Sequence, residues 1–141
     1  MDLRMLSDQF LVAPQISKAD LALVKAKGIR SVICNRPDGE EADQPTFEEL
    51  SVTAKHLGLH MRYIPISGGT VQDADVALFK DALSDLPKPI LAYCRSGTRS
   101  ATLWSLAQAK AMPLADILRA TQQAGYDMTE VLRPFTGAAE A

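Results

Sequence analysis

Short apolar runs alternate with amphipathic stretches along the chain, and this alternation limits the folds that it can adopt. The pattern predicts strands at residues 3–7, 9–13, 29–35, 61–66 and 88–94, and helices at 16–28, 46–58, 73–86, 97–110 and 113–125. Strands and helices that alternate across short loops are typical of an α/β sheet with helices on both faces. We therefore expect a central, mostly parallel sheet of about four to five strands.

The length of the chain, 141 residues, indicates one domain with a single core. The pattern suggests a last short turn of helix at residues 128–135, followed by a polar end. We place the catalytic domain at 1–135 and a flexible tail at 136–141.

Charge and hydropathy exclude several classes of partner. The formal net charge is −2, which argues against a general nucleic-acid binder. No apolar run is long enough to cross a membrane, so we expect no membrane partner and, by default, a cytoplasmic location. The few cysteines and histidines lack zinc-ligand spacing, so we expect neither a metal nor another cofactor.

Three loops of the predicted sheet follow the ends of its strands, after Cys34, Ile66 and Tyr93. In open α/β sheets, ligands bind beyond the carboxyl ends of the strands. These loops are therefore where we expect the functional site.

The segment CRSGTRS, which begins at Cys94, joins the last predicted strand to a helix. The free N–H groups and the dipole at a helix start favour an anion, and also a thiolate. Gly97 lets the backbone curl so that N–H groups point inward, and Arg95 and Arg99 can hold an oxyanion by two hydrogen bonds each. These parts fit a nucleophile inside an anion-binding loop, whereas the alternative is a buried structural cysteine.

These residues, together with motifs elsewhere in the chain, resemble two known families. YCRSGTRS resembles the active loop of single-domain rhodanese-like sulfurtransferases. Together with VAPQIS, VICNRPDGEE and YIPISGG, LAYCRSGTRS resembles the bacterial beta-lactamase-hydrolase-like phosphatase-like family. The second resemblance covers nearly the whole chain, and it implies the dual-specificity, protein-tyrosine-phosphatase-like fold.

The family resemblance implies a role for each residue of the loop. Cys94 would be the nucleophile, and Arg99 would be the arginine that holds the anion. Ser100 would hydrogen-bond the thiolate or the ligand. The backbone N–H groups of the anion-binding loop would come from Arg95, Ser96, Gly97, Thr98 and Arg99.

The loop departs from the phosphatase pattern in length. Phosphatases of this kind place five residues between cysteine and arginine and a histidine before the cysteine, whereas four residues separate Cys94 from Arg99 and Tyr93 comes first. Sulfurtransferase loops have the shorter length. We therefore expect sulfur transfer through a Cys94 persulfide first, and phosphomonoester hydrolysis through a Cys94 phosphocysteine as the alternative. A redox- or anion-sensing module without enzymatic activity is the third possibility.

The expected substrate is a small anion, either thiosulfate or a persulfide in the first case, or a phosphate ester in the second. A phosphatase also needs a general acid, and no acidic residue directly follows the YIPI strand. Asp73 could serve as that acid on a glycine hinge. The alternative, which we favour, is that Asp73 only begins the third helix.

Residues after the second core strand complete the set of candidates. Cys34 could act as a redox partner of Cys94, or it could be a small buried residue of the strand. Arg36 and Asp38 are candidates for the pocket rim, and one of Arg36, Asp38 and Glu40 could contact Arg99. The alternative is a solvated turn shaped by the proline and glycine of this loop.

Overall fold

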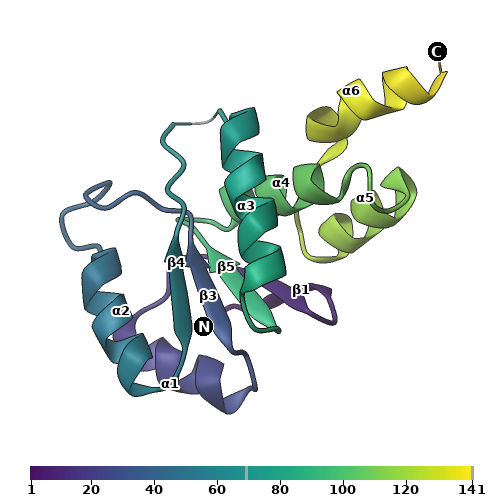
Figure 1. Ribbon diagram of the computed structural model, residues 1–141. Helices are drawn as coiled ribbons and strands as arrows, with labels where there is room; N and C mark the ends of the chain where they lie inside the picture. Colours follow the sequence, from purple (N-terminus) through teal and green to yellow (C-terminus); the bar gives the residue numbers. More distant parts are fainter. Residues whose placement is uncertain (69, 141) are drawn as a thin grey trace.

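The computed structural model describes residues 1–68 and 70–140, and in these ranges the chain forms five strands and six helices (Figure 1). The strands are β1 (Arg4–Ser7), β2 (Phe10–Ala13), β3 (Ser31–Cys34), β4 (His60–Tyr63) and β5 (Ile90–Tyr93). The helices are α1 (Lys18–Ala26), α2 (Phe47–His56), α3 (Asp73–Asp85), α4 (Thr98–Gln108), α5 (Leu114–Gln123) and α6 (Thr129–Glu140).

One sheet holds all the described strands, in the order β1-β2-β5-β3-β4. β2, β5, β3 and β4 run parallel to one another, and only β1, at one edge, runs antiparallel to its neighbour β2. The predicted mostly parallel α/β sheet is therefore confirmed. Its central strands β3 and β5 are buried along their whole length, which explains why their sequences are continuously apolar.

Helices cover both faces of the sheet (Figure 1). Alternate residues of β3 point to opposite faces, so Ile33 packs with α3–α6 and Val32 packs with α1 and α2. The core on the larger side includes Phe79, Trp104 and Leu132, which come from α3, α4 and α6.

Two predicted elements differ from the observed ones. β4 ends at Tyr63 although we expected a strand to residue 66. The N–H groups of Ile64 and Ile66 still donate to Cys34 and Asn35, but these acceptors are consecutive residues, so the regular register of the ladder is lost after Tyr63. α6 is longer than the short turn expected at residues 128–135, and its buried Leu132 packs in the same core as Trp104 of α4. The boundary between a domain and a tail at residue 136 stays a prediction, and Ala141 lies outside the described residues.

Candidate active site

Cys94 lies where β5 ends and the turn into α4 begins. Its side chain is fully buried, and its sulfur accepts a hydrogen bond of 3.1 Å from the backbone N–H of Gly97. Gly97 is the N-cap of α4, with φ at +93°. Sulfur, loop N–H and helix N-terminus therefore meet at the carboxyl edge of the sheet, as the sequence predicts.

Arg99, in the first turn of α4, is held through the two terminal nitrogens of its guanidinium. Nη1 donates to Glu40 Oε2 at 2.7 Å and to the carbonyl oxygen of Ile66 at 2.8 Å, and Nη2 donates to Glu40 Oε1 at 2.9 Å. A guanidinium has five N–H donors. Within the part of the chain that the structure describes, the Nε–H and the second Nη2–H donate to no protein oxygen, and these two form a side-on edge that has the geometry to bind an oxyanion.

The pKa values of Arg99 and Glu40 reflect this contact. Hydrogen bonds from Arg99 and then, against the penalty of burial, from Arg36 lower the pKa of Glu40 to about 2. The pKa of Arg99 is raised, mainly by Glu40 and to a smaller extent by the nearby Cys94. Glu40 is therefore a fixed anion at neutral pH, and Arg99 lies within electrostatic reach of the Cys94 sulfur.

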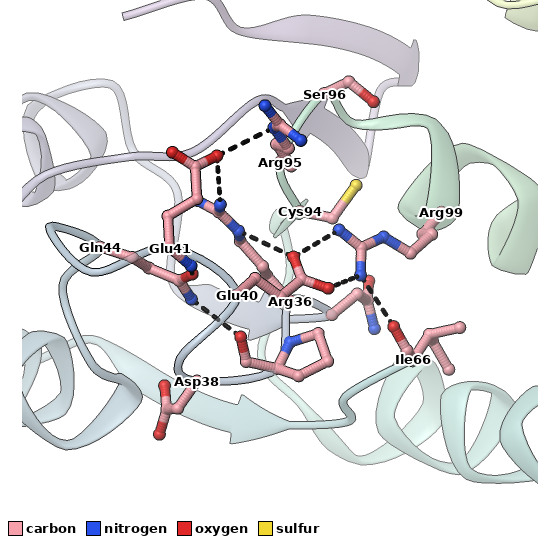
Figure 2. A network of polar contacts seen from close by, with 12 residues as sticks. Arg36, Asp38, Glu40, Glu41, Gln44, Ile66, Cys94, Arg95, Ser96 and Arg99 are labelled. Carbon is pink, nitrogen blue, oxygen red and sulfur yellow. Dashed lines mark hydrogen bonds and ion pairs between the residues drawn. The ribbon is translucent and has the colours of Figure 1, made fainter. Parts of the chain in front are cut away.

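Arg36 supports the contact between Glu40 and Arg99 by holding Glu40 in place. Its side chain is only 4% exposed, and its Nε donates to Glu40 at 3.0 Å, its Nη2 to Glu41 at 3.1 Å and its Nη1 to Gln15 at 3.0 Å. Glu41 also pairs with Arg95 at 3.1 Å, so one network connects the β3–α2 loop to the Cys94 loop (Figure 2). The expected rim position of Arg36 is thus corrected, because three acceptors hold its guanidinium inside.

Asp38 faces the start of α2. Its carboxylate Oδ1 accepts the N–H of Phe47, the first residue of α2, at 2.8 Å, and its own N–H donates to the hydroxyl of Tyr63. Its carboxylate points away from Cys94 in Figure 2. The rim role of Asp38 stays a prediction beside this capping contact, whereas the expected contact between this loop and Arg99 is confirmed at Glu40.

The hydroxyl groups of the loop bond within the protein. Ser100 is buried and donates to Asn35 Oδ1 at 2.8 Å, while Asn35 Nδ2 donates to the carbonyl of Ile64. A hydroxyl has one proton to donate, and in this structure that proton goes to Asn35; the expected hydrogen bond of Ser100 to the thiolate or the ligand stays a prediction. Ser96 and Thr98 are joined by a hydrogen bond of 3.1 Å between their hydroxyls.

Cys34 lies at the end of β3, paired in register with Tyr93 of β5. Both cysteines are free and buried. The Cys34 thiol donates to the carbonyl of Arg36 at 3.2 Å, and burial raises its pKa to about 11. Its role as a redox partner of Cys94 stays a prediction, and its thiol is protonated at neutral pH.

Asp73 is the first residue of α3. It lines a hollow between α3, α4 and α6, together with Val71, Lys80, Lys110 and Phe135, and no residue of the Cys94 loop lines this hollow. The helix cap comes instead from Asp75, whose Oδ2 accepts the N–H of Gln72 at 2.9 Å. The general-acid role of Asp73 stays a prediction.

Four residues of the site were missed by the sequence analysis. Asn35 directly follows a buried strand at the ligand edge, and Glu41 and Gln15 lie in loops at the same edge, so their polarity was a usable signal. Tyr126 gave no such signal. It follows α5, far along the chain, and its hydroxyl donates to the carbonyl of Ser96 in the Cys94 loop at 3.1 Å.

Among residues 1–68 and 70–140, no three histidine, cysteine or acidic side chains gather as metal ligands would. No helix in these ranges has the length and apolar character needed to cross a membrane.

Comparison with known sequences assigns the family. The sequence model described as "Beta-lactamase hydrolase-like protein, phosphatase-like domain" matches residues 2–111. The chain belongs to this family. The matched part of this phosphatase-like domain contains the sheet, Cys94, Arg99 and Glu40, and it ends before α5.

Relatives and solved structures agree with this assignment. The beta-lactamase hydrolase-like protein of Agrobacterium fabrum is 35% identical over 104 residues, which are 74% of this chain and 24% of that protein. The chain thus spans about a quarter of that relative. A candidate phosphatase from Neisseria meningitidis is 33% identical, with a TM-score of 0.85 over 98% of this chain and 99% of that one.

A more distant structure agrees in fold alone. The core catalytic domain of the PP-IP phosphatase SIW14 from S. cerevisiae is 15% identical, with a TM-score of 0.66 over 99% of this chain and 93% of that one. The phosphatase-like domain therefore has the tyrosine-phosphatase-like fold that the resemblance implied. These comparisons favour the phosphatase alternative, and they give no support to sulfur transfer, which we expected first.

Proposed function

We propose that the protein is a cysteine-dependent phosphatase that hydrolyses small phosphate monoesters through a Cys94 phosphocysteine. The observation that carries the proposal is the free side-on edge of Arg99 beside a buried cysteine at a helix start. Two parallel N–H groups match two oxygens of a phosphoryl group, and the loop N–H groups and the α4 N-terminus favour its negative charge.

The reaction consists of two displacements at phosphorus. The Cys94 thiolate attacks the phosphoryl group, an S–P bond forms and the ester P–O bond breaks, so the alcohol leaves with a proton from a general acid. Water then attacks the phosphocysteine and gives a proton to the deprotonated general acid, the S–P bond breaks, and inorganic phosphate and the thiolate are released. In both steps Arg99 binds the phosphoryl oxygens, where negative charge gathers in the transition state.

Membership in a phosphatase-like family supports this reaction over sulfur transfer. Further support comes from the fixed charge of Glu40, because a loop arginine that is already oriented needs no reordering when the ester binds. Asp73 is the candidate for the general acid, although its place as the first residue of α3 also fits the helix start that we favoured from the sequence. It lines a hollow without residues of the Cys94 loop, so the acid role requires movement toward the leaving oxygen.

Purified protein assayed with p-nitrophenyl phosphate tests the proposal. We expect phosphate release that Cys94→Ser abolishes and that Arg99→Lys lowers by about a hundredfold, because a lysine cannot present two parallel donors. Arg119→Lys, on the exposed face of α5, is the matched control and should retain full activity.

A parallel assay with thiosulfate and cyanide separates the alternatives. Thiocyanate release that depends on Cys94, without phosphate release, would overturn the proposal in favour of sulfur transfer. If neither product forms, while oxidation joins Cys34 and Cys94 in a disulfide, the sensing function would replace it.

A further inference from the structure

One peptide group of the Cys94 loop is hydrogen-bonded at both ends. The peptide between Ser96 and Gly97 donates its N–H to the Cys94 sulfur at 3.1 Å, and its carbonyl oxygen accepts the hydroxyl of Tyr126 at 3.1 Å. In a planar trans peptide the C=O and the N–H point in opposite directions. The hydroxyl that fixes the carbonyl therefore also fixes the direction of the N–H toward the sulfur.

Tyr126 is held between Arg4 of β1 and the Cys94 loop. Its side chain is 6% exposed, and the guanidinium of Arg4, from β1, stacks over its ring at 5.1 Å. Arg4 Nη1 also donates to the carbonyl of Ala124 at 3.1 Å. Burial, the largest cause, raises the pKa of Tyr126, so the phenol stays protonated at neutral pH and can donate to the Ser96 carbonyl.

The contact between Tyr126 and the loop leaves no room for another atom. A Cβ on Gly97 would lie 2.1 Å from the Tyr126 hydroxyl oxygen and 3.3 Å from Val12 Cγ1. The Tyr126 hydroxyl thus packs directly against the Ser96–Gly97 peptide and blocks rotation of the peptide in that direction. Tyr126 lies outside residues 2–111, the part that the family sequence model matches.

We propose that Tyr126 is a positioning residue for Cys94, which acts through the Ser96–Gly97 peptide by aiming its N–H at the sulfur. Hydrogen bonds in a chain polarise one another, so the phenol also strengthens the N–H as a donor to the thiolate. The inference rests on the proposed role of Cys94 as nucleophile. It assigns part of the active-site support to the segment after α5, beyond the matched family region.

Titration of the Cys94 thiol tests the inference without a substrate, so its failure is distinguishable from the failure of the proposed function. The thiolate is measured by its ultraviolet absorbance against pH, with the spectrum of the matching Cys94→Ser variant subtracted. The titratable or charged groups around Cys94 include Arg95 and Arg99 of its own loop, Glu40 from the β3–α2 loop, Cys34 from β3, and Tyr126 with Arg4 against its ring. All except Tyr126 are unchanged in Tyr126→Phe.

We expect Tyr126→Phe to move the midpoint of thiolate formation upward by about half to one pH unit, as loss of one aligned hydrogen-bond donor implies. Tyr63→Phe is the matched control, because its hydroxyl also bonds a backbone group, the N–H of Asp38, but not the Ser96–Gly97 peptide. Thermal unfolding of both variants shows that they are folded. An unchanged midpoint in a folded Tyr126→Phe, or an equal shift in Tyr63→Phe, would overturn the inference.

Discussion

Glu40 holds Arg99 by the end of its guanidinium, with both carboxylate oxygens engaged at 2.7 and 2.9 Å. The two residues are far apart in the sequence, in the loop after β3 and in the first turn of α4. Glu40 is at the same time a hydrogen-bond acceptor of the buried Arg36. The Glu40 carboxylate therefore orients Arg99 through Nη1 and Nη2. It leaves the edge formed by Nε–H and the second Nη2–H for a substrate.

Replacement of Glu40 tests this orientation. We expect Glu40→Gln to lower kcat/KM for p-nitrophenyl phosphate by about tenfold, because an amide accepts only one of the two charge-assisted hydrogen bonds and Arg99 loosens. Steady-state kinetics measures the effect. Glu48→Gln, on the exposed side of α2, is the control; an equal loss there would contradict the orienting role.

Glu40 also gives the fold a defined sensitivity to acid. Its pKa falls from 4.5 to about 2 in the folded state, so its ionised form stabilises the fold fully above 4.5, and this contribution disappears as the pH drops toward about 2. The free energy of unfolding of the natural protein and of Glu40→Gln should therefore differ by a constant amount above 4.5 and converge below it. Urea unfolding at a series of pH values measures both. A gap that stays constant down to about pH 2 would contradict the assignment.

Gly97→Ala should disrupt the loop more than glycine replacement at other turns. The new Cβ would lie 2.1 Å from the Tyr126 hydroxyl, and the residue would keep a φ of +93°. Gly28→Ala is matched in backbone strain, since Gly28 has a φ of +86° and no atom within 4 Å of the added Cβ. We expect about 1–2 kcal/mol of lost stability at Gly28 and a larger loss at Gly97.

The double variant Gly97→Ala with Tyr126→Phe separates the two causes. It removes the atom at 2.1 Å but leaves the ring carbon at 3.0 Å and the backbone strain. Thermal unfolding should therefore show a partial recovery compared with Gly97→Ala. No recovery at all would mean that the clash with the hydroxyl is not what destabilises the loop.

The role of Asp73 can be tested by changing the leaving group. p-Nitrophenolate leaves as a stable anion, so Asp73→Asn should hardly slow its release, whereas an alkyl phosphate should be hydrolysed about a hundredfold more slowly. Asp81→Asn, an exposed carboxylate further along α3, is the control. Equal rates for Asp73→Asn and the natural protein on both substrates would exclude Asp73 as the general acid.

The sheet could be predicted well from the sequence because the signals for strands and helix starts lie in neighbouring residues. Continuous burial of β3 and β5 appears as unbroken apolar runs, and the helix starts appear as capping residues such as Ser17, whose hydroxyl accepts the N–H of Asp20. The Cys94 loop was found in the same way. Its N–H groups, glycine and arginines are adjacent in the chain, so their chemistry could be inferred without knowledge of the fold.

Contacts between distant segments were beyond the sequence. The partner of Ser100 is Asn35, and the partner of the Ser96 carbonyl is Tyr126, and no spacing rule connects either pair. The charge of the loop after β3 was visible, but which acidic residue meets Arg99 depends on the path of the backbone. Asp38 caps α2, which leaves Glu40 to reach the arginine.

The support that Tyr126 gives to the loop bears on the order in which the protein matures during synthesis. A nascent chain that has released residues 1–111 already contains every described strand and the cysteine. It still lacks the tyrosine that aims the Gly97 N–H, and Arg4 of the first strand has no ring to stack on. The hydrogen bond that aims the Gly97 N–H can therefore form only after residue 126 has been released, later than the strands and the cysteine have been synthesised.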